Sequence, residues 1–404
     1  MSVPAGAHVT LAAATTSYYH PAAAGAPAAE YRFESFRATL LLLDTTEIDR
    51  RGLAFRRLTK LTQPWVTENP LFFHLTDTTP IGVRQAVDDA ADVGIEMIVQ
   101  SFGTSFQMEN NSSGYMAILK DEIKYASAHG VEIGGYDLID LDRGGLGYDS
   151  EAIGADGSIG GSACFASQWV DHLDPLIEAK IAAANLSMVE TDGPYGGGIC
   201  SATNHTHHAS VLDSQYWQAR LQSEFYQKMR SLGVFVNAPD VYFSKGANKM
   251  MQVRVHLCCP DPRRHSHPPA RVSRAIANPC SGLGGLGGVL LRFYGDPTNF
   301  GKPRKMDLLL SRQMLFDSSY EWITTQGWSF IPLDNYGGGG GAEARFRPLE
   351  ANHVDYDLAW AQYMGYGVAG VCWRGPRIFE GPVSKAIVKG WIAFYNRSAR
   401  RSPP

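Results

Sequence analysis

Short apolar runs, each long enough for one buried strand, alternate along most of this chain with stretches of helical periodicity. Most of the runs end in Gly, Asp or Pro, and they cover residues 71–75, 96–102, 131–137, 187–192, 234–240, 328–334 and 368–373. The apolar side chains between them recur every three or four residues, in the sets Val83, Val87 and Ala90; Met116, Leu119, Ile123 and Ala126; Trp217, Leu221, Phe225 and Met229; and Val383, Ile387, Trp391 and Phe394. This alternation is typical of a parallel sheet with helices outside it, so the sequence predicts the α/β class.

Repeated strand–helix units predict a (β/α)8 TIM-type barrel within residues 34–397. The seven recognisable units are one short of a closed barrel. Residues 36–43 are one candidate for the eighth strand, and a segment beyond Pro404 is the other, which we favour. The Ala-rich residues 1–33 and the tail 398–404 are predicted to lie outside the barrel.

Residues 252–291 interrupt this pattern, because they have neither a helical nor a strand period and are rich in Pro and Gly. We therefore predict an irregular insertion in the barrel. Its cysteines and histidines match no standard zinc spacing. The loop histidines at 205, 207 and 208 favour loop polarity or hydrogen bonding to a substrate over metal binding, so we assign no metal ligand and no cofactor.

Composition excludes several classes of partner. The formal net charge is −4 and no basic field exists, so nucleic acid is not an expected partner. No apolar run is long enough to cross a bilayer, which predicts a soluble chain without a membrane partner. N-glycosylation triplets begin at Asn110, Asn111, Asn185, Asn204 and Asn396, and they favour a glycoprotein that is secreted or lies in the secretory-pathway lumen. The oligomeric state stays open.

Carboxylates end several predicted strands, at Asp77, Asp137, Asp192, Asp240 and Asp334. In a parallel barrel the carboxyl ends of the strands meet at one mouth. Two carboxyl groups that flank a glycosidic bond are what glycoside hydrolysis requires, although an Asp in this position also serves as a helix N-cap.

Asp192 fits the N-cap role least well, because Gly193, Pro194 and three further glycines follow it closely and do not open a helix. We predict that its carboxylate faces a cavity and acts as the nucleophile. Two-residue alternation places Glu190 on the same face, one layer below the mouth, where it would tune the site or accept a substrate hydroxyl.

Several stretches together resemble the catalytic barrel of the α-galactosidase-like retaining glycoside hydrolases of clan D. They include HGVEIGGYD, ETDGPYGGGIC, NAPDVYFSKGANKM, TTQGWSFIPLDNYGGGG and GYGVAGVCWRGPRIF, and the resemblance covers residues 34–397 outside the insertion. It implies that Asp192, which ends the fourth strand, is the nucleophile and that the acid/base lies on the sixth strand. We take 328–334 as that strand, which makes Asp334 the candidate, with Asp240 and Asp296 as competitors.

The sequence therefore predicts a retaining exo-glycosidase for terminal α-galactosides or similar sugars, with carbohydrate as its partner. The further substrate-binding candidates lie at or just past strand ends, and they are Asp137, Glu190, Tyr195, Lys249, Asp296, Trp328 and Arg374. Two alternatives remain: a non-catalytic or degenerate carbohydrate-binding barrel and a metal-dependent sugar isomerase.

Overall fold

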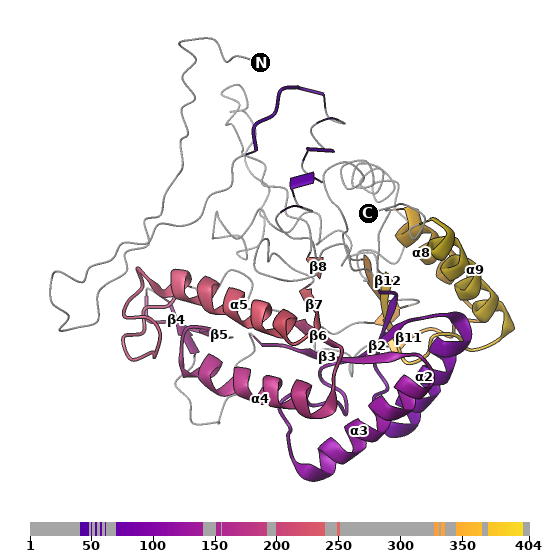
Figure 1. Ribbon diagram of the computed structural model, residues 1–404, viewed down its shortest axis with the longest axis horizontal. Coiled ribbons are helices and arrows are strands. Elements are labelled where there is room, and N and C mark those ends of the chain that lie inside the picture. The colour runs from indigo at the N-terminus through magenta and orange to yellow at the C-terminus, as the bar shows by residue number, and fades with distance from the viewer. Residues whose placement is uncertain are drawn as a thin grey trace.

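Eight parallel strands form one sheet in the computed structural model of the chain (Figure 1). The structure describes residues 41–47, 50, 53–54, 57–58, 61, 70–139, 151–154, 156–191, 199–238, 249–250, 327–330, 333–335, 345–365 and 371–398. The strands of the sheet are β1 (Phe72–Leu75), β2 (Met97–Gln100), β3 (Glu132–Asp137), β6 (Met188–Thr191), β7 (Phe235–Ala238), β8 (Lys249–Met250), β9 (Gly327–Phe330) and β12 (Val371–Gly375). Each of the seven predicted runs overlaps one ring strand, although the run 328–334 is divided between β9 and a strand outside the ring, and β12 extends two residues past the run 368–373.

The strand order in the sheet is β8-β7-β6-β3-β2-β1-β12-β9. If the strands are arranged in a circle, each is next to the strand that precedes or follows it in the chain, and β8 and β9 are the two ends. The step that makes it a ring is the parallel pairing of β1 with β12, in which Phe72 is opposite Cys372 and His74 is opposite Arg374. The first and last strands of an open sheet in chain order would not be neighbours. This wrap-around pairing is the arrangement of a (β/α)8 barrel, so the predicted fold class is confirmed.

The eighth ring strand that the structure describes comes from neither predicted source. β12 pairs directly with β1, so no further strand lies between them. Residues 41–43 are described and form no strand, while 36–40 lie outside the described residues. The additional strand is the two-residue β8, which pairs with β7 through Asn237 and Lys249. It escaped prediction because two residues carry no readable periodicity.

The helices follow the strands around the ring (Figure 1). They are α2 (Pro80–Val93), α3 (Ser113–Ala128), α4 (Gln168–Ala184), α5 (Ser214–Ser231), α8 (His353–Gly365) and α9 (Pro382–Ser398). Successive helices from α2 to α5 are in contact, and α9 contacts both α2 and α8. The helical layer therefore repeats the cyclic order of the strands that it covers.

Local sequence explains where α2 begins and ends. The Thr79 hydroxyl accepts a hydrogen bond from the Gly82 amide at the N-cap, and Pro80 occupies the first turn, where it loses no helical hydrogen bond. Gly94 ends the helix in the left-handed conformation, with φ of 91°. The Asp77 carboxylate accepts from the Thr79 hydroxyl at 2.8 Å, so this strand-end Asp supports the helix start.

The last helix buries a different face from the one we predicted. Val383 and Phe394 of the predicted stripe are 44% and 43% exposed. The side chains that α9 buries are Ser384, Val388, Ile392 and Tyr395, one position further along. Ile387 and Trp391 of the predicted set are partly buried and pack against the edge of the core.

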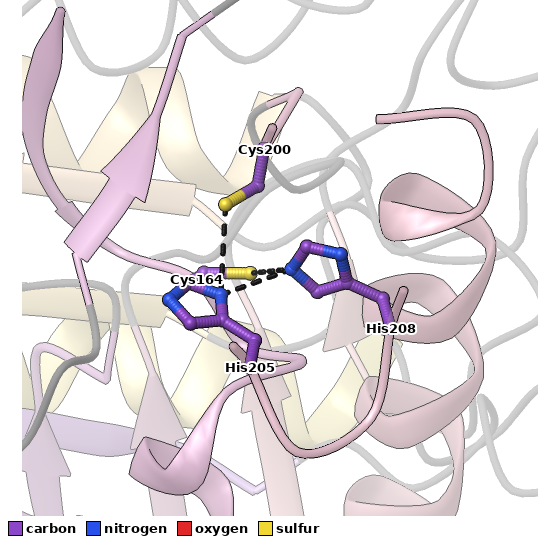
Figure 2. Close-up of side chains that lie close together, drawn as sticks. All are labelled: Cys164, Cys200, His205 and His208. Atoms are coloured by element: carbon purple, nitrogen blue, oxygen red, sulfur yellow. Dashed lines mark hydrogen bonds between the residues drawn. The ribbon is translucent and has the colours of Figure 1, made fainter. Parts of the chain in front are cut away.

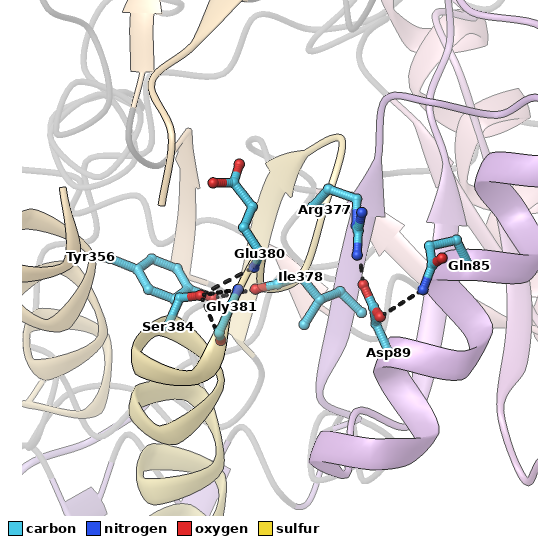
Figure 3. Close-up of polar contacts among 8 residues, drawn as sticks. All are labelled: Gln85, Asp89, Tyr356, Arg377, Ile378, Glu380, Gly381 and Ser384. Atoms are coloured by element: carbon cyan, nitrogen blue, oxygen red, sulfur yellow. Dashed lines mark hydrogen bonds and ion pairs between the residues drawn. The ribbon is translucent and has the colours of Figure 1, made fainter. Parts of the chain in front are cut away.

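Polar contacts join the end of β12 to α8, α9 and α2 (Figure 3). The Tyr356 hydroxyl on α8 donates to the Ile378 carbonyl at 2.7 Å. The Arg377 side chain donates to Asp89 on α2 at 3.3 Å. The Ser384 hydroxyl accepts from the Glu380 amide at 3.1 Å at the start of α9. These bonds fix the helices on either side of the β12–β1 pairing.

Two small antiparallel hairpins lie outside the ring. One pairs β4 (Glu151–Ile153) with β5 (Ile159–Ala163), and the other pairs β10 (Leu333–Asn335) with β11 (Arg345–Phe346). The predicted insertion 252–291 and the segment 1–33 lie outside the described residues. In the part of the chain that the structure describes, no helix is both long and apolar enough to span a bilayer.

Candidate active site inside the ring

Alternating residues of the ring strands face two different cores. Phe73, Ile98 and Val189 belong to the large core beneath the helices. Their neighbours Phe72, Met97 and Met188 form a separate cluster with Val99, Tyr136 and Phe235. Because side chains alternate between the faces of a strand, this second cluster fills the inside of the ring.

Toward the carboxyl ends of the strands the inward-facing side chains become polar. His74 on β1, Glu190 on β6 and Asn237 on β7 are each 0% exposed. They come two residues after Phe72, Met188 and Phe235, so they form the next layer of the interior. Glu190 is in register with both Tyr136 on β3 and Asn237 on β7. We call His74, Tyr136, Glu190 and Asn237 the inner polar layer.

Glu190 is the centre of the inner polar layer. The Asn237 side-chain amide donates to Glu190 Oε2 at 2.7 Å. His74 Nε2 lies 3.2 Å from Glu190 Oε1. The Tyr136 ring meets the His74 ring edge to face, with centroids 5.0 Å apart. The carboxyl group is therefore held by a hydrogen bond at Oε2, whereas His74 Nε2 only approaches Oε1 without a hydrogen bond between them.

This arrangement suits Glu190 for support of a reaction rather than for attack on a substrate. A side chain with 0% exposure cannot reach a substrate without displacing its neighbours. Its contacts with His74 and Asn237 suit it instead to fix the inward face of β6 relative to β1 and β7. The same contacts place Glu190 on the inward face of β6, and its predicted role toward a substrate stays a prediction.

A pocket of about 440 Å³ opens beside the inner polar layer. Asp137, the last residue of β3, lines it together with Phe102, Thr104 and Asn110 from the loop after β2. The Phe102 ring also contacts the Tyr136 ring edge to face, with centroids 6.4 Å apart. The structure therefore places Asp137 at a strand end and against a cavity, as the sequence indicated.

The other predicted residues fall into two groups. Lys249, Trp328 and Arg374 lie on ring strands β8, β9 and β12, and Arg374 is in register with His74 on β1. Asp192, Tyr195, Asp240 and Asp296 lie outside the described residues, so their predicted roles stay predictions. Asp192 follows directly after Thr191, the last residue of β6.

The assignment of Asp334 to the end of the sixth ring strand was wrong. The apolar run 328–334 divides into β9, which ends at Phe330, and β10, which pairs antiparallel with β11. Asp334 is in β10, outside the ring. In addition, β9 is the seventh ring strand in chain order, and β8 is the sixth. Pro332 lies between the two strands and provides a physical reason for the break, because proline cannot donate to a sheet.

Sequence reasoning missed His74, Tyr136 and Asn237. Each lies within a motif that ends in one of the strand-end Asp residues: HLTD, GGYD and NAPD. His74 and Asn237 each come three residues before that Asp. A polar residue at the last inward position of an otherwise apolar strand was the signal that could have found them.

Comparisons with known proteins show likeness in structure only. No protein-family model matches the chain, and no curated protein does either. The α-galactosidase from Lactobacillus brevis is similar over 87% of this chain and 44% of its own, with 12% identity and a TM-score of 0.50. The GH36 α-galactosidase AgaB from Geobacillus stearothermophilus matches at 10% identity and a TM-score of 0.49, over 87% of this chain and 45% of its own.

An α-amylase from Geobacillus thermoleovorans complexed with acarbose gives 9% identity and a TM-score of 0.45, over 83% of this chain and 80% of its own. The chain spans less than half the length of the α-galactosidases that it matches. At such identities the likeness shows the fold alone, and the Lactobacillus brevis enzyme, with its TM-score of 0.50, supports it.

Proposed function

We propose that the chain is the catalytic barrel of a retaining exo-glycosidase that removes a terminal α-galactosyl or similar sugar. The observation that carries this proposal is the inner polar layer, in which Glu190 contacts His74 and Asn237. Glu190 lies on β6, two residues before Asp192 in the chain. The fold shared with an α-galactosidase supports it. The sequence resemblance to clan-D glycosidases supports it independently.

In this mechanism Asp192 attacks the anomeric carbon and displaces the aglycone, which leaves a sugar ester on its carboxylate. A second carboxylic acid protonates the leaving oxygen and then takes a proton from the water that hydrolyses the ester. Retaining enzymes hold the two carboxyl groups about 5 Å apart. Glu190 acts through its position, because its contacts with His74 and Asn237 hold the inward face of the strand that precedes Asp192.

Asp240 is the preferred acid/base in this proposal. It follows β7, the ring neighbour of β6, by two residues. Asp334 is disfavoured because it lies in the β10–β11 hairpin outside the ring. Asp296 stays a competitor on its sequence position alone.

The first test compares the wild type, Asp192→Asn and a control on a panel of nitrophenyl glycosides with the α-galactoside first. Asp121→Asn is a matched control, because Asp121 is exposed on α3 and pairs with Arg84 at the surface. We expect Asp192→Asn to lose at least about 10³-fold in turnover and Asp121→Asn to keep wild-type activity. Retention of more than a few per cent by a folded Asp192→Asn would refute the nucleophile.

Rescue by azide distinguishes the acid/base from the nucleophile. An acid/base variant tested with an activated nitrophenyl leaving group is still glycosylated, so azide should restore its turnover and give a glycosyl azide of retained configuration. We expect this of Asp240→Asn and not of Asp334→Asn. Folded wild-type protein that hydrolyses none of the nitrophenyl glycosides would favour a non-catalytic carbohydrate-binding barrel.

A further inference from the structure

Two cysteines and two histidines from separate segments meet in a buried cluster that the proposed glycosidase mechanism does not use (Figure 2). Cys164 follows strand β5, Cys200 lies in the segment after β6, and His205 and His208 precede α5. All four side chains are buried, and their candidate ligand atoms lie within 4.8 Å of one another. We call these four residues the Cys2His2 cluster.

The geometry points to a structural zinc site formed by Cys164 Sγ, Cys200 Sγ, His205 Nδ1 and His208 Nε2, and we propose that the chain binds one Zn²⁺ there. Four protein ligands of this kind form a closed tetrahedral site, which leaves no position for water or substrate. The proposal concerns a structural ion, and it stands whether or not the barrel hydrolyses glycosides.

The distances between ligand atoms fit this assignment. A tetrahedral Zn²⁺ with bonds of about 2.3 Å to sulfur and about 2.0–2.1 Å to nitrogen separates neighbouring sulfur and nitrogen ligands by about 3.5–3.6 Å. The distance from Cys164 Sγ to His208 Nε2 is 3.5 Å, and that from Cys200 Sγ to His205 Nδ1 is 3.6 Å. The two ring nitrogens are 2.9 Å apart, so a bound ion would separate the rings by a few tenths of an ångström.

Neighbouring groups orient two of the four ligands, His208 and Cys200. The Nδ1–H of His208 donates to the Ser210 carbonyl at 3.2 Å, which directs the Nε2 lone pair of the same ring toward the cluster. The Ile153 amide donates to Cys200 Sγ at 3.4 Å, as a backbone amide does for a thiolate ligand. Both contacts come from residues outside the four ligands.

The surroundings also favour a bound ion over a cluster that is merely polar. Ala152, Ala166 and Ala202 form an apolar core with the two cysteines, and Trp217 packs against it. Four polar side chains enclosed by apolar ones are costly unless a charge or a full set of hydrogen bonds satisfies them. The third loop histidine, His207, differs, because its Nε2 lies 2.7 Å from the Asp171 carboxylate outside the cluster.

A zinc ion here would join the β4–β5 hairpin, which follows β3, to the segment between β6 and α5. These two segments belong to neighbouring strands of the ring. The same β6-to-α5 segment carries Asp192 near its start. The ion would therefore fix the far end of the loop that bears the candidate nucleophile.

The test measures the metal directly. The full chain, purified under reducing conditions without chelator, should contain about one zinc ion per chain by elemental mass spectrometry. The double variant Cys164→Ser/Cys200→Ser leaves the other cysteines of the chain in place and should contain none. His207→Ala is the matched control and should keep the zinc.

Cobalt provides the second measurement, on wild-type protein, in case the double variant does not fold. After zinc is removed with a chelator, Co²⁺ should produce the intense visible absorption of a tetrahedral thiolate site, and Zn²⁺ should abolish it. Chelation should also lower the melting temperature of the wild type. Wild-type protein without zinc and without this cobalt spectrum would overturn the proposal, as would a disulfide between Cys164 and Cys200 or undiminished zinc in the folded double variant.

Discussion

Replacement of Glu190 by leucine should destabilise the barrel strongly, because it removes the centre of the inner polar layer. Two contacts are lost: the Asn237 amide donor at 2.7 Å and the His74 ring nitrogen at 3.2 Å. The hydrogen bond from Asn237 contributes about 1.5–3 kcal/mol, and the substitution also leaves the buried His74 ring nitrogen without the polar atom that faces it. Removal of one member of a buried polar cluster of this kind costs about 3–5 kcal/mol in all.

Calorimetry and guanidinium unfolding measure this effect. At about 2.1 cal/mol/K of unfolding entropy per residue, a loss of 1 kcal/mol lowers the melting temperature of a chain of 404 residues by a little over about 1 °C, so Glu190→Leu should lower it by about 4–6 °C. Glu190→Gln is the matched control. Its amide can accept from Asn237 and donate to His74, so it should cost less than about 1.5 kcal/mol.

A double-mutant cycle measures whether His74 and Glu190 interact. His74→Phe/Glu190→Leu removes both partners, so no unpaired group remains between them, and its cost should fall clearly below the sum of the two single costs. Strict additivity would mean that His74 and Glu190 do not interact. A Glu190→Leu variant within about 0.5 kcal/mol of the wild type would refute the inner polar layer as a stabilising unit.

Three further predictions concern other parts of the molecule. Gly134→Ala should destabilise by about 1–3 kcal/mol in guanidinium unfolding, because its Cβ would lie 2.5 Å from Met188 Cβ inside the ring. Burial raises the pKa of Asp174 to about 8, so the native carboxyl keeps a proton that the unfolded chain has lost, and stability should fall as pH rises from about 4 to about 8. Asp174→Asn should therefore raise the melting temperature at pH 9 more than at pH 4. Tyr356→Phe leaves the Ile378 carbonyl without its 2.7 Å donor and should cost about 1–2 kcal/mol in the same assay.

Each of these predictions has a control and a contradicting result. Gly114→Ala, on an open position of α3, should be neutral or stabilising, so a loss equal to that of Gly134→Ala would contradict the steric argument. An Asp174→Asn effect that is equal at both pH values would contradict the raised pKa. Tyr125→Phe removes an exposed hydroxyl bonded to Asp88 and should cost little; a similar cost at Tyr356 would mean that burial adds nothing there.

The part of the fold that sequence predicted is the part that depends on local spacing. The inward stripe of α3, Met116, Leu119, Ile123 and Ala126, is buried as its period indicated. The strands were found because each contains a short apolar run that is followed by Gly, Asp or Pro in most cases. Helix α4 was missed, although it is a full helix, because Pro175 interrupts its pattern. Hairpin β4–β5 was missed because its strands are short and rich in small residues.

The candidate site was predicted only in part, because local spacing relates residues of one strand but not residues of different strands. Glu190 was placed correctly, because two-residue alternation within one strand fixes the face on which it lies. Its partners His74 and Asn237 belong to other strands, and no local pattern relates them to it. The half-site Cys200, His205 and His208 is visible in the sequence as C-x4-H-x2-H.

By itself, then, the sequence determined the number and kind of the units: apolar runs for strands, three- and four-residue spacings for helices, and an α/β class built from their alternation. Tertiary structure alone decided that β12 pairs with β1, that Asp334 lies outside the ring, and that Cys164 meets Cys200 and two histidines. The physical reason is that periodicity acts over a few residues, whereas contacts between distant segments depend on how the whole ring of strands curves and closes.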